Sequence, residues 1–160
     1  MINDQLLDAI YRGEAQLLRD GLASSAGVVD VDEDGRTVLM CALLADIPAP
    51  VKSEILEILL ERGAPVNHRD TGQAWTALAF AARDCSAAIC SLLIAAGAEI
   101  DATDTFGNTP LWRATMVGRE ENVRLLLARG ANPDHANKND VSARIVAARL
   151  GRHYFENTGS

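Results

Sequence analysis

The side chains that could perform acid–base or metal chemistry are dispersed along this sequence. No HExxH, GxSxG or glycine-rich phosphate-binding motif occurs, so the spacing that those chemistries need is missing. The histidines and several aspartates stand in segments of turn composition, where Asp is favoured for hydrogen bonds to its own backbone. We interpret them as loop residues and expect no catalytic residue, no metal site and no cofactor. The residues concerned are His68, His135, His153, Asp101, Asp104, Asp134 and Asp140.

One acidic cluster has residue types that could hold a cation. Asp30, Asp32, Glu33 and Asp34 place carboxylates at nearly alternating positions, and calcium sites use oxygen ligands in this way. The cluster lacks the regular spacing and the distant Glu of an EF-hand loop. We interpret it as an exposed loop that repels nucleic acid and attracts a cationic surface.

The formal net charge of −7 is concentrated in the first half of the chain. Residues 1–80 carry 6 Lys and Arg against 13 Asp and Glu, whereas residues 81–160 carry 9 against 9. A protein that binds nucleic acid needs a basic face, so we expect no nucleic-acid partner. The charge favours a partner protein with a basic surface.

Length and composition limit the fold class. A chain of 160 residues has room for one compact domain or a short array of repeats. Aromatic residues make up only 4% of the chain, and a core of Leu and Ala favours packed helices. The cysteines Cys41, Cys85 and Cys90 show no CxxC spacing, which predicts reduced, mostly buried thiols. The sequence shows no signal-peptide pattern and no long apolar run, which predicts a soluble, cytoplasmic protein without membrane association.

Two blocks of sequence recur with a period of about 33 residues. The first block reads EILEILLERGA at 54–64, AICSLLIAAGA at 88–98 and ENVRLLLARGA at 121–131. The second reads GRTVLMCAL from Gly35, AWTALAFAA from Ala74, GNTPLWRAT from Gly107 and DVSARIVAA from Asp140. The first interval, from Thr37 to Thr76, is 39 residues, with five extra residues around 45–50 and a sixth in 68–74. A repeat of this length indicates a solenoid.

Each repeat predicts two helices and an extended turn. A Thr or Ser before a Leu- and Ala-rich run is a good N-cap, and the Gly after the Leu-rich run suits a left-handed C-terminal residue. Small Ala side chains allow the second helix to approach closely. We expect successive antiparallel helix pairs at 37–44 and 53–62, at 76–83 and 86–95, and at 109–116 and 120–128.

The repeats resemble the ankyrin repeat family. Residues 104–136 read DTFGNTPLWRATMVGREENVRLLLARGANPDHA, similar to the family pattern DxxGxTPLHxAAxxGxxxxVxxLLxxGAxxN. The Pro of the TPL motif is present only as Pro110, and the His that follows in the family is replaced in every repeat. Its positions hold Met40, Ala79, Trp112 and Ile145.

The resemblance implies an all-α ankyrin repeat solenoid of about four repeats with a degenerate N-terminal cap. We expect one domain over 1–160, with caps at 1–29 and 135–160 and repeats at 30–67, 68–101 and 102–134.

The resemblance also implies a concave binding face made of the turn tips and the first helix of each repeat. Trp75 and Phe106 are the expected apolar anchors, the alternative being that they pack as core. Trp112 is expected to be partly buried between repeats. The residues that match the family's binding positions are Asp32, Glu33, Asp34, Arg36, Gln73, Trp75, Arg83, Asp84, Thr105, Phe106, Asn108, Met116, Val117, Lys138 and Asn139.

These observations favour a non-catalytic, monomeric protein-binding module over an enzyme. The chain resembles short bacterial ankyrin proteins, which include proteins proposed as immunity proteins against secreted toxins, and the negative charge suits a toxin with a basic cleft. A scaffold or assembly adaptor is the alternative. A small-molecule binder or an enzyme in the groove between turns and helices is less favoured, because the polar residues do not converge.

Overall fold

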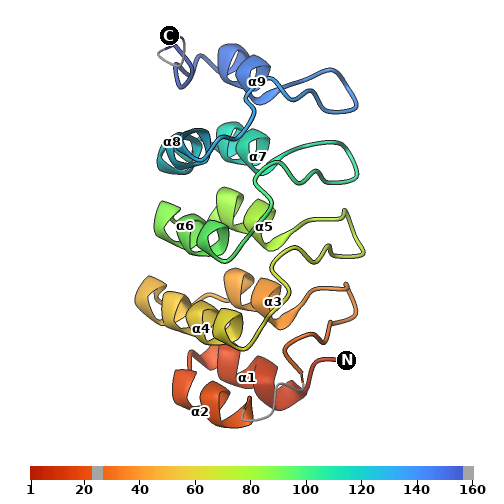
Figure 1. The fold of residues 1–160 in the computed structure, drawn as a ribbon, viewed down its shortest axis with the longest axis vertical. Helices are drawn as coiled ribbons and strands as arrows, with labels where there is room; N and C mark the ends of the chain where they lie inside the picture. Colours follow the sequence, from red (N-terminus) through yellow and green to blue (C-terminus); the bar gives the residue numbers. More distant parts are fainter. Residues whose placement is uncertain (23–26, 157–160) are drawn as a thin grey trace.

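The structure, a computed structural model, describes residues 1–22 and 27–156, and its regular secondary structure is helical. Four antiparallel helix pairs and a final single helix stack into one elongated array, with loops projecting to one side (Figure 1). The prediction of an all-α repeat solenoid is confirmed. The helices are α1 (Asp4–Arg12), α2 (Ala15–Gly21), α3 (Val38–Leu44), α4 (Ala49–Glu61), α5 (Ala77–Asp84), α6 (Ala87–Ala95), α7 (Pro110–Val117), α8 (Glu120–Ala128) and α9 (Ala143–Arg149).

The array has an inner and an outer row of helices. In the inner row α1, α3, α5, α7 and α9 each contact the next, and in the outer row α2 contacts α4 and α6 contacts α8. The loops before α3, α5, α7 and α9 project from the inner row (Figure 1). We call these loops the fingers, at residues 31–37, 69–76, 103–109 and 136–142. The surface formed by the fingers and the inner row is the inner face.

The inner helices begin where the hydroxyl side chains predict. The side chains of Thr37, Thr76, Thr109 and Ser142 each accept a hydrogen bond from the backbone N–H three residues later. This bond satisfies one of the free N–H groups at a helix start. At the other end of each unit, Gly63, Gly97 and Gly130 have φ of 84°, 92° and 90°, the left-handed values expected of a C-terminal glycine.

The extra residues of the first repeat lengthen its outer helix. α4 begins at Ala49, four residues before the expected start, and has 13 residues where α6 and α8 have 9. Pro50 lies in its first turn, where the missing N–H of proline costs nothing. The segment that breaks the repeat period is therefore ordered helix together with the loop before it.

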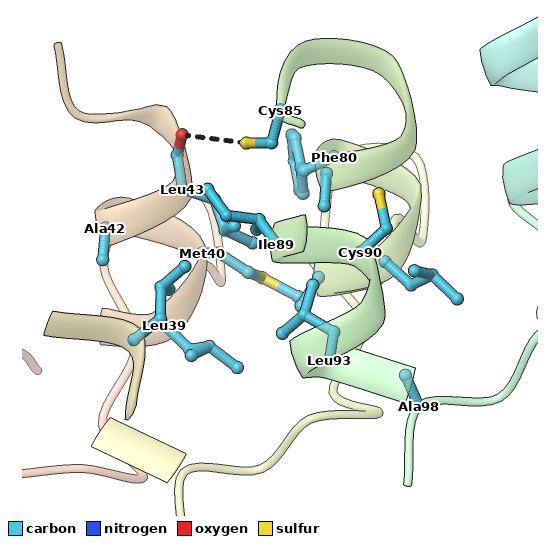
Figure 2. Packing of buried hydrophobic residues seen from close by; sticks show 14 of the residues in the cluster. Leu39, Met40, Ala42, Leu43, Phe80, Cys85, Ile89, Cys90, Leu93 and Ala98 are labelled. Carbon is cyan, nitrogen blue, oxygen red and sulfur yellow. Dashed lines mark hydrogen bonds between the residues drawn. The ribbon is translucent and has the colours of Figure 1, made fainter. Parts of the chain in front are cut away.

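The core runs along the axis of the array between the two rows. Leu78, Leu93, Leu111 and Leu126, one from each of the helices α5 to α8, are fully buried. Met40 and Leu43 of α3 point toward Ile89 and Leu93 of α6, with Phe80 of α5 nearby, and all belong to one buried hydrophobic cluster (Figure 2).

The three thiols belong to this core, as predicted. All are buried and free, and the Sγ of Cys85 donates to the carbonyl oxygen of Leu43 at 3.8 Å (Figure 2). Burial raises the pKa of Cys41 and of Cys90 to about 12, so both are protonated at neutral pH. Among the described helices, none combines the length and apolarity needed to cross a bilayer.

Candidate protein-binding face

Each finger is built on one Asp or Asn side chain. Asp32 accepts from the backbone N–H groups of residues 34 and 36 at 2.9 and 2.8 Å, and Asp104 accepts from those of Phe106 and Asn108 at 2.8 and 2.9 Å. Asp70 and Asn137 bond their own fingers in the same way. The interpretation of Asp104 as a turn residue is confirmed. Asp32 therefore holds the backbone of its finger in place in addition to contributing negative charge.

The fingers are joined to one another by backbone hydrogen bonds. The N–H of Thr71 donates to the carbonyl oxygen of Asp34 at 3.0 Å, that of Thr105 to Gln73 at 2.9 Å, and that of Lys138 to Phe106 at 2.9 Å. Each finger tip is thereby fixed against the next. The residues that project from the tips are held on a common frame.

Trp75 is buried, so its expected role as an exposed anchor is wrong. Its side chain is covered by Phe80, with ring centres 4.9 Å apart, and by Arg83 and Arg113, whose guanidinium carbons lie 4.5 and 3.7 Å from the indole ring. The indole N–H donates to Gln73 at 3.1 Å. Only 6% of the residue is exposed. The alternative interpretation, packing as core, describes this residue.

Asn108 is also buried, because it links two fingers. Its side-chain amide donates to Asp104 at 3.1 Å and its carbonyl oxygen accepts from the amide of Asn137 at 2.8 Å. A side chain held in this way supports the finger and is not presented to a partner. The expectation that Asn108 belongs to the exposed surface is therefore wrong.

A buried ion pair lies beneath the third finger. The guanidinium of Arg113 bonds the carboxylate of Asp104, whose side chain is only 1% exposed. Burial raises the pKa of Asp104, but hydrogen bonds from Asn108, Arg113 and Phe106 outweigh it, and the net pKa is below the ordinary value. The carboxylate is charged at neutral pH and holds Arg113 over Trp75.

Several predicted charged residues pair with their neighbours. Arg83 and Asp84 form a bidentate pair at 2.6 to 2.9 Å, and Arg36 bonds Asp34 at 2.7 Å. Exposed pairs of this kind contribute little to stability and remain available to a partner. The other predicted tip residues, Glu33, Gln73, Thr105, Lys138 and Asn139, are exposed.

Exposed apolar side chains occur on the third finger, on α7 and directly after α9. Phe106 is 49% exposed, Met116 41% and Val117 47%, in agreement with their assignment to the surface. Leu150 is 47% exposed and was not singled out from the sequence. The repeat could have predicted its exposure, because Leu150 follows the exposed Val117 by the repeat interval of 33 residues.

A hollow of about 340 Å³ lies at the N-terminal end of the row of fingers. Its acidic lining comprises Asp32, Glu33 and Asp34 of the first finger and Asp4 of α1. Asp4 was missed because it belongs to the N-terminal cap, outside the repeat pattern. Four acidic residues from the first half of the chain therefore line one hollow on the surface.

The remaining candidates for chemistry serve as loop contacts. The Nε2 of His68 lies 2.9 Å from the carbonyl oxygen of Gly35, and Asp134 pairs with Arg144 at 2.7 Å. Asp101 accepts from the backbone N–H of Asn132 in the next repeat at 3.2 Å. Trp112 is partly buried against the core, as expected for a residue between repeats.

Comparison with known proteins agrees with this architecture. The family described as ankyrin repeats, three copies, matches residues 49–137. Ankyrin repeat domain-containing protein 37 of Bos taurus is 35% identical over 109 residues, which cover 68% of this chain and 68% of the bovine protein.

Two other relatives are longer than this chain. Ankyrin repeat domain-containing protein 63 of Mus musculus is 34% identical over 151 residues, 91% of this chain and 38% of the mouse protein. A putative ankyrin repeat-containing protein of Treponema pallidum is 37% identical over 98 residues, 60% of this chain and 32% of the bacterial protein. The chain thus spans about two fifths of the length of the mouse relative. With its helix pairs, fingers and repeat motifs, the chain belongs to the ankyrin repeat family, whose repeats form a protein–protein interaction module.

Proposed function

We propose that this chain is a non-catalytic module that binds a partner protein through its inner face. The observation that carries the proposal is a set of exposed apolar side chains on this face: Phe106 on the third finger, Met116 and Val117 on α7, and Leu150 directly after α9. Apolar residues grouped on the surface of a soluble protein mark interaction sites. Phe106 sits on a finger that is bonded to its neighbours, so little backbone conformational entropy is lost there when a partner is bound.

The charge of the inner face favours a basic partner at its N-terminal end. Asp4, Glu33 and Asp34 are exposed around the acidic hollow. A partner with Lys and Arg at the matching position would be steered toward it, with faster association at low salt.

An inhibitor of a basic toxin is the specific role that we propose for such a module. A toxin that attacks nucleic acid carries a basic cleft, and a module whose acidic end of the inner face covers that cleft would block its substrate. A scaffold would bind a partner without blocking its activity, so the two roles differ in a measurable way.

The test begins with the partner and then maps the face. A tagged chain is purified from its own organism, the bound protein is identified, and its affinity is measured for the parent, Phe106→Ala and Leu17→Ala. Leu17 of α2 is the matched control because it is 50% exposed and lies outside the inner face. We expect Phe106→Ala to weaken binding by about 1 to 2 kcal/mol and Leu17→Ala to have no effect. Equal affinities for all three proteins would contradict the inner-face assignment.

A second pair of variants tests the charge, and an activity assay tests inhibition. Glu33→Lys should slow association, most strongly at low salt, whereas Glu57→Lys on the outer helix α4 should not. The identified partner is then assayed for nuclease activity with and without saturating chain. Loss of activity supports the inhibitor role, and retained activity in the complex assigns a scaffold role.

A further inference from the structure

A small apolar groove lies at the C-terminal end of the inner face, between α7, α9 and the fourth finger. Its volume is about 250 Å³. Small-molecule sites are typically about 300 to 1,000 Å³, so this groove suits one bulky side chain. The lining residues are Trp112, Met116, Asn137, Asn139, Val141, Val146, Arg149 and Leu150.

The groove is open and leaves apolar surface in water. Met116 and Leu150 are 41% and 47% exposed, and Trp112 is partly buried against the core. The indole N–H of Trp112 is buried and has no hydrogen-bond partner in the described part of the chain. A buried donor without a partner is a cost that most proteins avoid. The groove therefore combines exposed apolar side chains with a tryptophan whose buried N–H is unpaired.

The surroundings of the groove are positively charged. Arg149 is the only charged residue among the lining residues given above, and Lys138 stands between Asn137 and Asn139 at the finger tip. Arg152 donates hydrogen bonds to the carbonyl oxygens of Thr115 and Met116 at the end of α7. Asp140 is the acidic residue of the same finger, and Arg149 is the charged residue that lines the groove itself.

The two ends of the inner face thus carry opposite charge. The hollow beside the first finger is lined by four carboxylates, whereas the charged residue that lines the groove beside the fourth finger is Arg149. A bound protein must match both ends, which fixes its orientation along the array. Charge complementarity therefore specifies what enters the groove.

We propose that the groove receives a bulky apolar side chain of the partner protein that stands directly beside an Asp or Glu. This proposal rests on the proposed function, because it names the chemistry of the partner at one end of the same face. The apolar side chain packs on Trp112, Met116 and Leu150. The neighbouring carboxylate pairs with Arg149 at the rim.

The test uses a random peptide library displayed on phage as the probe. The library is selected on the parent chain after removal of phage that bind Leu150→Asp. We expect the enriched peptides to carry Leu, Ile, Met or Phe next to Asp or Glu. Enriched peptides without a carboxylate, or with Lys or Arg in its place, overturn the proposal.

Matched variants then show where the selected peptide binds. A synthetic peptide of the enriched sequence should bind Leu150→Asp and Arg149→Glu about tenfold more weakly than the parent or worse. Ile145→Asp and Arg129→Glu are the controls, because Ile145 is a 38% exposed residue of α9 outside the groove and Arg129 ends the outer helix α8. Circular dichroism spectra confirm that the variants are folded. Equal loss with the controls overturns the proposal.

The test also separates this inference from the proposed function. A selection without any peptide that depends on Leu150 overturns the groove proposal. The binding module is judged by a different result, the Phe106→Ala comparison with the purified partner. If the partner binds Phe106→Ala more weakly than the parent but binds Leu150→Asp equally well, the binding-module proposal is supported and the groove proposal is overturned.

Discussion

The guanidinium carbon of Arg113 lies 3.7 Å from the centre of the Trp75 ring, so a residue of one repeat covers an aromatic residue of the repeat before it. Arg113 is in turn held by Asp104. A cation over a desolvated indole stabilises by up to about 2 kcal/mol. These three residues join the second and third fingers to the helices beneath them.

Replacing Trp75 by Ala should destabilise the fold and leave the inner face chemically unchanged. The substitution removes a buried ring and the support of two guanidinium groups, which should lower the free energy of unfolding by about 3 kcal/mol or more. Urea titration followed by circular dichroism measures this change. Phe106→Ala is the control and should change stability by less than about 0.5 kcal/mol, because half of the side chain is exposed. A Trp75→Ala protein that unfolds like the parent would contradict the packing described here.

Asp104 should make stability depend on pH in the acid range. Its pKa in the folded protein is lowered from 3.8, so the stabilisation is present above that value and is lost as the pH falls through the lower, folded value. In Asp104→Asn, Arg113 loses its charged partner and stability at pH 7 should fall by about 2 kcal/mol. Urea unfolding at pH 7 and at several values from about pH 5 down to pH 3 should show a flatter profile for the variant.

The control for this prediction is Asp134→Asn. The pKa of Asp134 is also lowered, chiefly by its hydrogen bond with Arg144, but its side chain is 63% exposed. Solvent screening makes such a pair weak, so this variant should follow the parent closely. Parallel acid profiles for the parent and Asp104→Asn would contradict the role of the buried pair.

The backbone of the second finger contains a strained residue. Ala74 has φ of 58°, whereas the equivalent place in the third finger is Gly107, with φ of 81°. Ala74→Gly should raise the free energy of unfolding by about 1 kcal/mol, because glycine adopts the left-handed region without steric cost. Thermal melting checks the direction, and a lower melting temperature for Ala74→Gly would disprove it.

The reverse substitution should weaken the third finger. In Gly107→Ala a Cβ would stand 3.1 Å from the Cα of Asn137 and from the backbone nitrogen of Lys138. Either the finger or its neighbour must shift, in addition to the strain of the positive φ. We expect a loss of more than about 1 kcal/mol in the same melting experiment.

Leu111 tests the interface between repeats. It is fully buried, so Leu111→Ala should cost about 2 to 5 kcal/mol through the cavity it leaves. In a short array each repeat relies on its neighbours, and the loss should lower the melting temperature of the whole chain. Leu17→Ala, at a half-exposed position, should melt like the parent. Equal melting of both variants would show that the interface is not built around Leu111.

The helices and their caps could be predicted because their signals are local and repeated. Thr37, Thr76 and Thr109 mark each start within a few residues, and the glycine after each outer helix marks its end. Trp75 could not be placed in the same way. Its finger is one residue longer than the others, and one of the side chains that cover it, Arg113, belongs to the next repeat. The burial of a loop residue depends on such contacts between repeats, which periodicity does not reveal.

The backbone hydrogen bond between each pair of neighbouring fingers makes amide exchange a measure of how often those fingers separate. The amide hydrogens of Thr71, Thr105 and Lys138 are each held by the preceding finger and not by their own. Each can exchange with solvent deuterium only when two adjacent fingers part, whether or not the local turn stays closed. The exchange rates of these three amides therefore report the separation of one repeat from the next. A partner that spans two fingers will slow exchange at the amide between them.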